Sequence, residues 1–177
     1  MEFRDVVRKR RSTRRYTGKP VEKEKLQAAM ELALLAPSSK NTRSTRLMGV
    51  TNLDKVHALG RLRDFGSSLL EEAGAAIIIL GDEEASPMWQ INAAIMANTL
   101  QLALVDQGLA SCWVHVGEYR TLQDDATSQR SEDYVKQILP EIPAGYRVLS
   151  VISIGYADYT PKPLPEYEGP ERILFVE

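Results

Sequence analysis

Hydrophobic residues recur along the chain in two patterns, one typical of helices and one typical of buried strands. Leu26, Met30 and Leu34 fall on one stripe of a helix whose first turn is acidic. The runs over residues 74–80 and 146–156 are apolar almost without interruption, which favours strands covered on both faces. We predict helices over residues 2–10, 22–35, 53–70, 89–105 and 131–139, and strands over 46–51, 74–80, 110–116 and 146–156.

The helix predicted over 89–105 is apolar on nearly every side, so we expect it in the middle of a domain, covered all round. That pattern also hints that a second subunit shares its cover. Because helices separate the strands, the class is α/β or α+β in one layered domain. We find no repeat or linker that divides residues 1–177. Four prolines follow position 157, so residues 157–177 are expected to form an extended C-terminal arm.

Composition narrows the class of protein. Of 177 residues, 44% are hydrophobic and 26% charged, which is ordinary for a globular domain. The single cysteine, Cys112, cannot form an intrachain disulfide and favours a reducing compartment. No apolar run reaches the roughly 20 residues of a membrane helix, and the amino terminus lacks a secretory pattern. We therefore expect a soluble, cytoplasmic protein without a membrane partner.

Charge is distributed unevenly along the chain. Residues 1–46 hold 13 Lys and Arg against 5 Asp and Glu, whereas residues 47–177 hold 9 against 19. A long nucleic acid binds through many phosphates and would be repelled by the acidic remainder. The imbalance favours a small phosphorylated ligand and argues against nucleic acid as a partner.

The densest basic stretch runs from Arg8 to Arg15, with six cations in eight residues. In an extended segment Arg10, Ser12 and Arg14 share one face, because side chains alternate. Guanidinium groups form bidentate, charge-assisted hydrogen bonds with phosphate oxygens. This pattern favours a phosphate clamp, and the alternatives are a solvated basic face or a nucleic-acid patch.

Two further stretches carry candidate binding groups, and several familiar motifs are missing. Residues 36–41 (APSSKN) place small polar side chains at a helix end, where an ordinary turn is the alternative. In residues 108–117, Cys112 is expected to be buried and His115 to be an ordinary histidine. With one cysteine and two histidines in the sequence, we predict no metal site. Few reactive side chains are available, which indicates chemistry supplied by a bound cofactor.

Three motifs, in this order, resemble those of the nitroreductase family of flavin enzymes: RRSTRRYTGKPV at 10–21, APSSKN at 36–41, and the long helix ending in GLASCW at 108–113. The resemblance implies an α+β fold, a three-layer α/β/α domain with a mostly antiparallel sheet. It also implies an intertwined homodimer with FMN bound at the subunit interface. NAD(P)H would then be a transient electron donor in a ping-pong reaction that reduces nitroaromatic, quinone or similar small acceptors.

The resemblance also implies which residues contact the cofactor. The basic segment would hold the phosphate and ribityl chain and bring a cation to the pyrimidine edge, the APSS-x-N loop would come from the partner subunit, and backbone N–H groups after the third motif would face the reactive flavin nitrogen. A late basic residue would reach the phosphate, with Lys162 as the alternative. The implied contacts are Arg10, Arg11, Ser12, Arg14, Pro37, Ser38, Ser39, Asn41, Val116, Gly117 and Arg172, and no side chain is expected to be catalytic.

Other functions stay open at this point. The same fold supports other flavin reactions, such as dehydrogenation, dehalogenation or flavin reduction. A module that binds anions or nucleic acid without catalysis is the alternative of a different class. The chain also departs from the family after Asn41, where many members continue x-Gln-Pro-Trp and this chain has Thr42, Arg43, Ser44 and Thr45.

Overall fold

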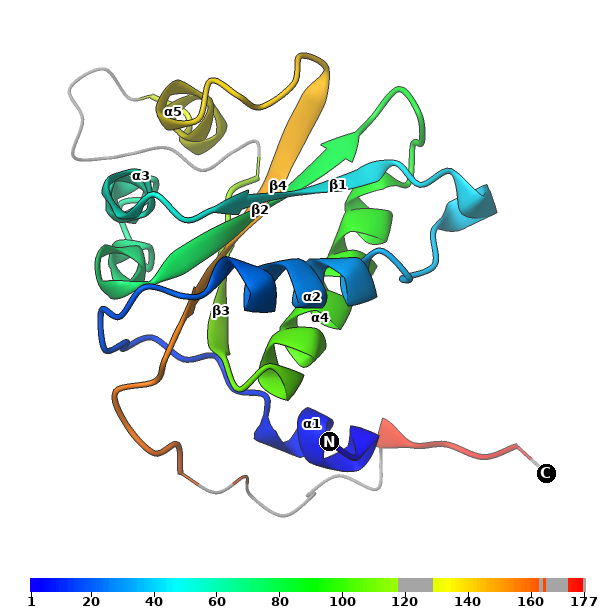
Figure 1. Ribbon diagram of the computed structural model, residues 1–177. Helices are drawn as coiled ribbons and strands as arrows, with labels where there is room; N and C mark the ends of the chain where they lie inside the picture. The colour runs from blue at the N-terminus through cyan, green and yellow to red at the C-terminus, as the bar shows by residue number, and fades with distance from the viewer. Residues whose placement is uncertain (118–128, 163, 165–171, 177) are drawn as a thin grey trace.

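A four-stranded antiparallel sheet forms the middle layer of the molecule (Figure 1). The computed structural model describes residues 1–117, 129–162, 164 and 172–176. The strand order is β1-β2-β4-β3, so β1 and β3 are the edge strands and every ladder is antiparallel. The strands are β1 (Thr45–Val50), β2 (Ala75–Asp82), β3 (Ala110–His115) and β4 (Tyr146–Gly155).

Helices cover both faces of this sheet, which confirms the predicted three-layer α+β architecture. One face carries α2 and α4, and the other carries α3, α5 and short 3₁₀ turns (Figure 1). Helix α1 lies against α4 at the lower end of the molecule. The helices are α1 (Phe3–Lys9), α2 (Lys23–Ala33), α3 (Leu53–Ala58), α4 (Trp89–Asp106) and α5 (Ser131–Ile138), and the 3₁₀ turns are Ser39–Asn41, Leu59–Arg61 and Ser68–Glu72.

The central strand β2 explains why the sheet needs cover on both sides. Its side chains alternate, so Ile78 and Leu80 pack into one core while Ile77 and Ile79 pack into the other. All four are at most 1% exposed. The continuous apolar run that predicted a buried strand therefore reflects two cores that share one sheet.

The helix predicted over 53–70 is wrong beyond its first two turns. Helix α3 ends at Ala58, and two 3₁₀ turns follow it. The hydroxyl of Ser67 donates to the carbonyl of Gly60 at 2.6 Å, and its oxygen accepts the N–H of Arg63 at 3.2 Å. Gly66 adopts a φ of +80°, which an α-helix does not contain. A side chain that captures backbone groups in this way competes with the helical ladder.

Helix α4 differs from its prediction in one respect. Its buried side includes Ala93, Leu100 and Leu104, but Ile91 is 52% exposed and Ile95 is 39% exposed. All-round cover is therefore wrong for a single copy of the chain. A second subunit is the cover that the sequence pattern suggested.

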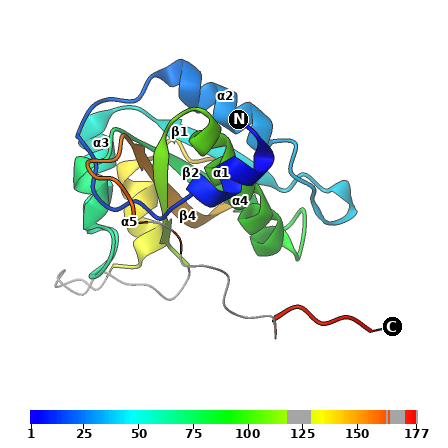
Figure 2. The same cartoon turned by 90° about the horizontal axis from the view of Figure 1, so that it is seen from below.

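The predicted C-terminal arm is described only at 157–162, 164 and 172–176, and its other residues lie outside the described part. Residues 172–176 lead away from the body of the domain in both views (Figures 1 and 2). They present four apolar side chains that are 56–101% exposed, at positions 173–176. Among the described residues, no helix has the length and apolar character needed to cross a bilayer.

An ion-pair network fastens α5 to the first residues of β4. Glu132, which is 7% exposed, accepts from Arg147 Nη2 at 2.9 Å, Lys136 Nζ at 3.0 Å and the N–H of Val148 at 3.0 Å. Burial alone raises the pKa of Glu132, but hydrogen bonds from these three donors outweigh it and hold the pKa below the ordinary value of 4.5. Arg147 also pairs with the more exposed Glu83.

We predict that Glu132→Gln lowers the free energy of unfolding by about 2–4 kcal/mol at neutral pH, because it removes the buried counter-charge of the half-buried Arg147 and leaves only the more exposed Glu83. A carboxylate with a depressed folded-state pKa stabilises the protein above its unfolded pKa, and that stabilisation is lost as the pH falls through the folded pKa. The difference between wild type and variant should therefore shrink below pH 4.5. Urea denaturation over that range tests this, with Glu83→Gln as a control of smaller effect; a gap independent of pH would contradict it.

Candidate functional site

The basic segment is attached to edge strand β3 as a short extra strand. The N–H of Thr13 donates to the carbonyl of Ser111 at 3.0 Å, and Ser12 forms a parallel bridge with Ser111. Further along, the N–H of Thr17 donates to Tyr156 O at 3.0 Å. These bonds hold the segment along the sheet edge, where Thr13 and Tyr16 are buried and Ser12, Arg14 and Arg15 stay exposed.

The inward side chains of this segment lock it in place. Thr13 and Tyr16 are 2% and 4% exposed. The Tyr16 hydroxyl donates to Thr13 O at 2.8 Å and forms a second hydrogen bond, of 2.7 Å, with the hydroxyl of Ser153. Burial raises the pKa of Tyr16 far above its ordinary value, so the phenol stays protonated and remains a donor. Ser12 and Arg14 consequently face outward.

Three of the predicted site residues gather around the thiol of Cys112. Burial raises the pKa of this thiol, whereas the charge of Arg14, a hydrogen bond with Ser12 and the charge of Arg10 each lower it. The Nη1 of Arg14 also donates to the carbonyl of Ser12 at 3.3 Å, which keeps these two residues together on the segment. Cys112 is 3% exposed, as the sequence predicted, and belongs to the hydrophobic core on that side of the sheet.

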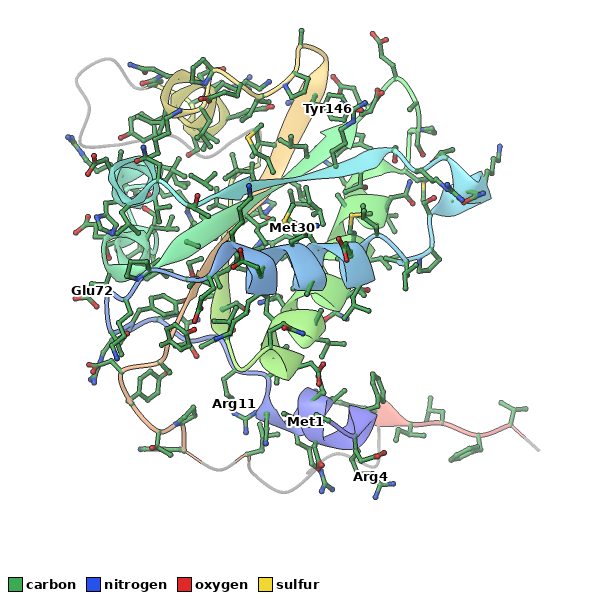
Figure 3. The ribbon with its side chains drawn as sticks, in the orientation of Figure 1. Met1, Arg4, Arg11, Met30, Glu72 and Tyr146 are labelled. Carbon is green, nitrogen blue, oxygen red and sulfur yellow. The ribbon has the colours of Figure 1, made fainter. Side chains whose placement is uncertain are left out.

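Arg11 points elsewhere. Its guanidinium donates to the carbonyl of Arg8 and, at 2.8 Å, to the carbonyl of Arg10. These carbonyls belong to the end of α1, where no helical N–H is available to them, and Figure 3 shows Arg11 beside that helix end. The structure therefore gives Arg11 a capping role and separates it from Arg10, Ser12 and Arg14.

Strand β3 connects this cluster to Val116 and Gly117. The N–H of Val116 donates to Leu149 O at 3.1 Å, so it serves the sheet and is not the donor that the sequence suggested. Gly117 has a φ of +57°, and a Cβ at this position would lie 2.7 Å from Nε2 of His115. Only glycine fits here without displacing the histidine ring, which stacks on Trp113 with centroids 6.3 Å apart.

The loop that follows α2 lies in a different part of the same chain. Asn92 of α4 fixes it: Asn92 Oδ1 accepts the N–H of Ser39 at 2.9 Å, and Nδ2 donates to Ser44 Oγ at 3.0 Å. In Figures 1 and 2 this light-blue loop lies well apart from α1 and the segment after it. Pro37, Ser38, Ser39 and Asn41 are thus not brought to the Arg10 cluster within one copy of the chain.

Two further residues bear on the site: Asn92, which the sequence analysis did not select, and Arg172, which it did. Asn92 was not among the predicted residues, although a buried amide in an apolar helix was visible in the pattern. Arg172 is exposed on the described end of the arm, residues 172–176.

Fold and site together define a three-layer α+β domain with a cluster of cationic side chains beside one edge strand. The sequence pattern of the nitroreductase family matches residues 7–64 and 52–156. An FMN-dependent nitroreductase from Clostridium difficile R20291 is 34% identical, and the match covers 97% of this chain and 98% of that structure with a TM-score of 0.86. The chain belongs to the nitroreductase family, which is a family of oxidoreductases.

Two more distant relatives agree with this assignment. A protein of Methanothermobacter thermautotrophicus with the provisional name NADH dehydrogenase/NAD(P)H nitroreductase is 26% identical over 176 residues, or 98% of this chain and 86% of that protein. A nitroreductase with bound FMN from Bacteroides fragilis NCTC 9343 has the same fold, with a TM-score of 0.75 over 100% of both chains, at 21% identity.

We predict that Tyr16→Phe lowers the free energy of unfolding by about 1–3 kcal/mol, because it removes the buried donor to the carbonyl of Thr13 and leaves the hydroxyl of Ser153 with only its 3.3 Å hydrogen bond to the carbonyl of Cys112. Urea denaturation measures the change. Tyr159→Phe is the matched control, since Tyr159 is 37% exposed and should tolerate the loss of its hydroxyl. Equal stability of the two variants would contradict the locking role of Tyr16.

Proposed function

We propose that the protein is an FMN-dependent NAD(P)H oxidoreductase of a single domain that acts as a homodimer. The observation that carries the proposal is the position of Arg10, Ser12 and Arg14 on a segment fixed to β3, with Ser12 and Arg14 exposed and Arg14 Nη1 donating to the carbonyl of Ser12 at 3.3 Å. Two guanidinium groups and a hydroxyl on one side of a fixed segment fit a dianionic phosphate. Family membership then favours FMN over other phosphorylated ligands.

Each part of the chain has a distinct task in this proposal. Arg10 and Ser12 hold the phosphate and the ribityl chain, and Arg14 brings positive charge to the pyrimidine edge of the flavin. The absence of a Cβ at Gly117 lets the flavin approach the backbone, and its N–H is the candidate donor to the ring. Arg172 on the arm is proposed as a further phosphate ligand, and Arg11 as a support for the segment.

The second half of the site is proposed to come from the partner subunit. The loop with Pro37, Ser38, Ser39 and Asn41 lies apart from the cluster of its own chain, and Asn92 holds it rigidly. Each chain also exposes apolar side chains that a monomer leaves in water, on α1, α4 and the arm: Phe3, Val7, Ile91, Ile95, Ile173, Leu174, Phe175 and Val176. A dimer that buries these surfaces would carry the loop of one chain to the cluster of the other.

When bound, FMN would supply the redox chemistry that passes electrons from NAD(P)H to a nitroaromatic, quinone or similar small acceptor in a ping-pong reaction. The chain contributes binding, orientation and electrostatics. Its cations favour negative charge on the ligand that they surround. No side chain of the described site needs to act as a nucleophile.

The clamp is tested with the double variant Arg10→Ala/Ser12→Ala. We expect wild-type protein to show a flavin absorption spectrum and to release about one FMN per chain on denaturation. Loss of one charge-assisted and one neutral hydrogen bond is worth about 2–4 kcal/mol, so the double variant should bind FMN about 30- to 1000-fold more weakly. Flavin fluorescence titration measures the Kd.

Arg4→Ala is the control for this experiment. It removes one exposed positive charge from α1, close in sequence to the clamp but outside the cluster (Figure 3). Its FMN affinity should equal that of the wild type. Full retention of flavin by the double variant would refute the clamp, and a protein that neither contains nor takes up FMN would refute the proposed function.

The shared site is tested at α4 with Ile95→Glu, which puts a charge on the exposed apolar face. Sedimentation should show a dimer for the wild type and a monomer with weakened FMN binding for the variant, because a buried unpaired charge is strongly unfavourable at an interface. Gln137→Glu adds the same charge on α5 and should remain dimeric. A wild-type monomer that holds FMN tightly would contradict the shared site.

A further inference from the structure

A cavity of about 450 Å³ opens beside the loop that follows α2. This volume is within the range of small-molecule sites. One wall is apolar, with Leu34, Leu35 and Met96, and the other is polar. The lining residues are Leu34, Leu35, Ala36, Pro37, Ser38, Asn41, Arg43, Thr45, Asn92 and Met96, and no carboxylate is among them.

Arg43 is the only charged residue in this lining, and it is held in place by its neighbours. Its N–H donates to Ser38 Oγ at 3.0 Å, and its Nε donates to Asn41 Oδ1 at 3.3 Å. Within the described residues nothing accepts a hydrogen bond from its two terminal nitrogens. A guanidinium with a fixed Nε and free terminal nitrogens is preorganised for a planar anion such as a carboxylate.

Thr45 gives a second and independent indication of a ligand. Its side chain lines the cavity, the residue is 6% exposed, and its Oγ1 has no hydrogen-bond partner among the described residues. Asn92, which lines the same cavity, is directed elsewhere: its Nδ2 donates to Ser44 Oγ and its Oδ1 accepts the N–H of Ser39. A buried hydroxyl without a partner is unfavourable, and an acceptor oxygen from a ligand would satisfy it.

The loop keeps this arrangement despite backbone strain. Lys40, Asn41 and Arg43 have φ values of 51°, 55° and 48°, in the left-handed region that non-glycine residues seldom occupy. Strained residues persist where surrounding contacts fix them, here the side chains of Asn92 and Ser38. Arg43 also stands where family members commonly have glutamine, so its charge is a property of this chain.

We propose that this cavity is the acceptor subsite and that it selects small aromatic acceptors carrying a carboxylate. Arg43 would bind the carboxylate, Thr45 would donate to it, and the apolar wall would cover the ring. The inference rests on the proposed function, because the loop reaches a flavin only in the proposed dimer. It adds the class of acceptor, which the anion clamp on β3 does not specify.

The test is equilibrium binding to the flavin-loaded dimer by calorimetry, with benzoate and the isosteric, neutral benzamide as probes. Wild type should prefer benzoate. Arg43→Gln, which installs the common family residue, should weaken benzoate about tenfold or more and change benzamide less than about twofold, as expected for loss of a charge-assisted bond. Lys40→Gln, a cation of the same loop outside the cavity lining, should leave both affinities unchanged.

Thr45→Val tests the second contact without changing charge or shape. It should stabilise the ligand-free protein, because the unpartnered hydroxyl is removed, and should weaken benzoate about three- to tenfold. In turnover, Arg43→Gln should lower kcat/KM for 4-nitrobenzoate relative to 4-nitrobenzamide by the same factor as in binding.

Several outcomes would overturn the acceptor assignment. The first is equal affinity of the wild type for benzoate and benzamide, and the second is an equal effect of Arg43→Gln and Lys40→Gln on benzoate binding. The third is an effect of Arg43→Gln confined to the KM of NADPH relative to that of NADH, which would assign Arg43 to the phosphate of the electron donor. Failure of the proposed function is recognised separately, since flavin content and sedimentation are measured first. A flavin-loaded dimer that reduces 4-nitrobenzamide but ignores the carboxylate refutes only this inference.

Discussion

The hydrogen bond from Thr13 N–H to the carbonyl of Ser111 determines the geometry of the cationic cluster. Strand β3 is an edge strand, and its outer backbone groups need partners. Pairing with the basic segment satisfies part of that edge and fixes the register of the segment. With Thr13 facing inward beside β3, strand alternation sends its neighbours Ser12 and Arg14 outward. A shift of one residue would turn Arg14 inward in place of Thr13, so the core selects the register.

The same constraint explains why one chain makes only part of a site. The cluster is fixed to β3, while the loop that carries Asn41 is fixed to α4 by Asn92. In the proposed dimer, the apolar side chains that α1, α4 and the arm expose would supply the driving force for association. In the proposed dimer, burial of these surfaces and completion of the site are one event.

Sequence reasoning succeeded where one local signal dominated. The apolar runs and helical stripes located every strand and all but one helix, because burial on both sheet faces leaves a plain pattern. It failed over residues 53–70, where a single hydroxyl, that of Ser67, redirects the backbone. It also misjudged Val116, because the N–H of this residue donates to Leu149 of β4, a strand that lies far away in the sequence. Arg43 has a positive φ that is held by contacts with Ser38 and Asn41. The pattern of hydrophobic and polar residues carries no signal for such contacts.

Electrostatics couples the two halves of the proposed site. The first 46 residues hold the excess positive charge, and the proposed dimer brings Arg10 and Arg14 of one chain toward the loop of the other, which carries Arg43. Like charges at close range oppose association in the absence of an anion. A bound phosphate reverses the sign of that interaction, so cofactor binding and dimer formation must strengthen each other by the same factor. Residues 47–177 carry net negative charge and repel polyanions. Only small anions are therefore expected to couple binding to dimer formation.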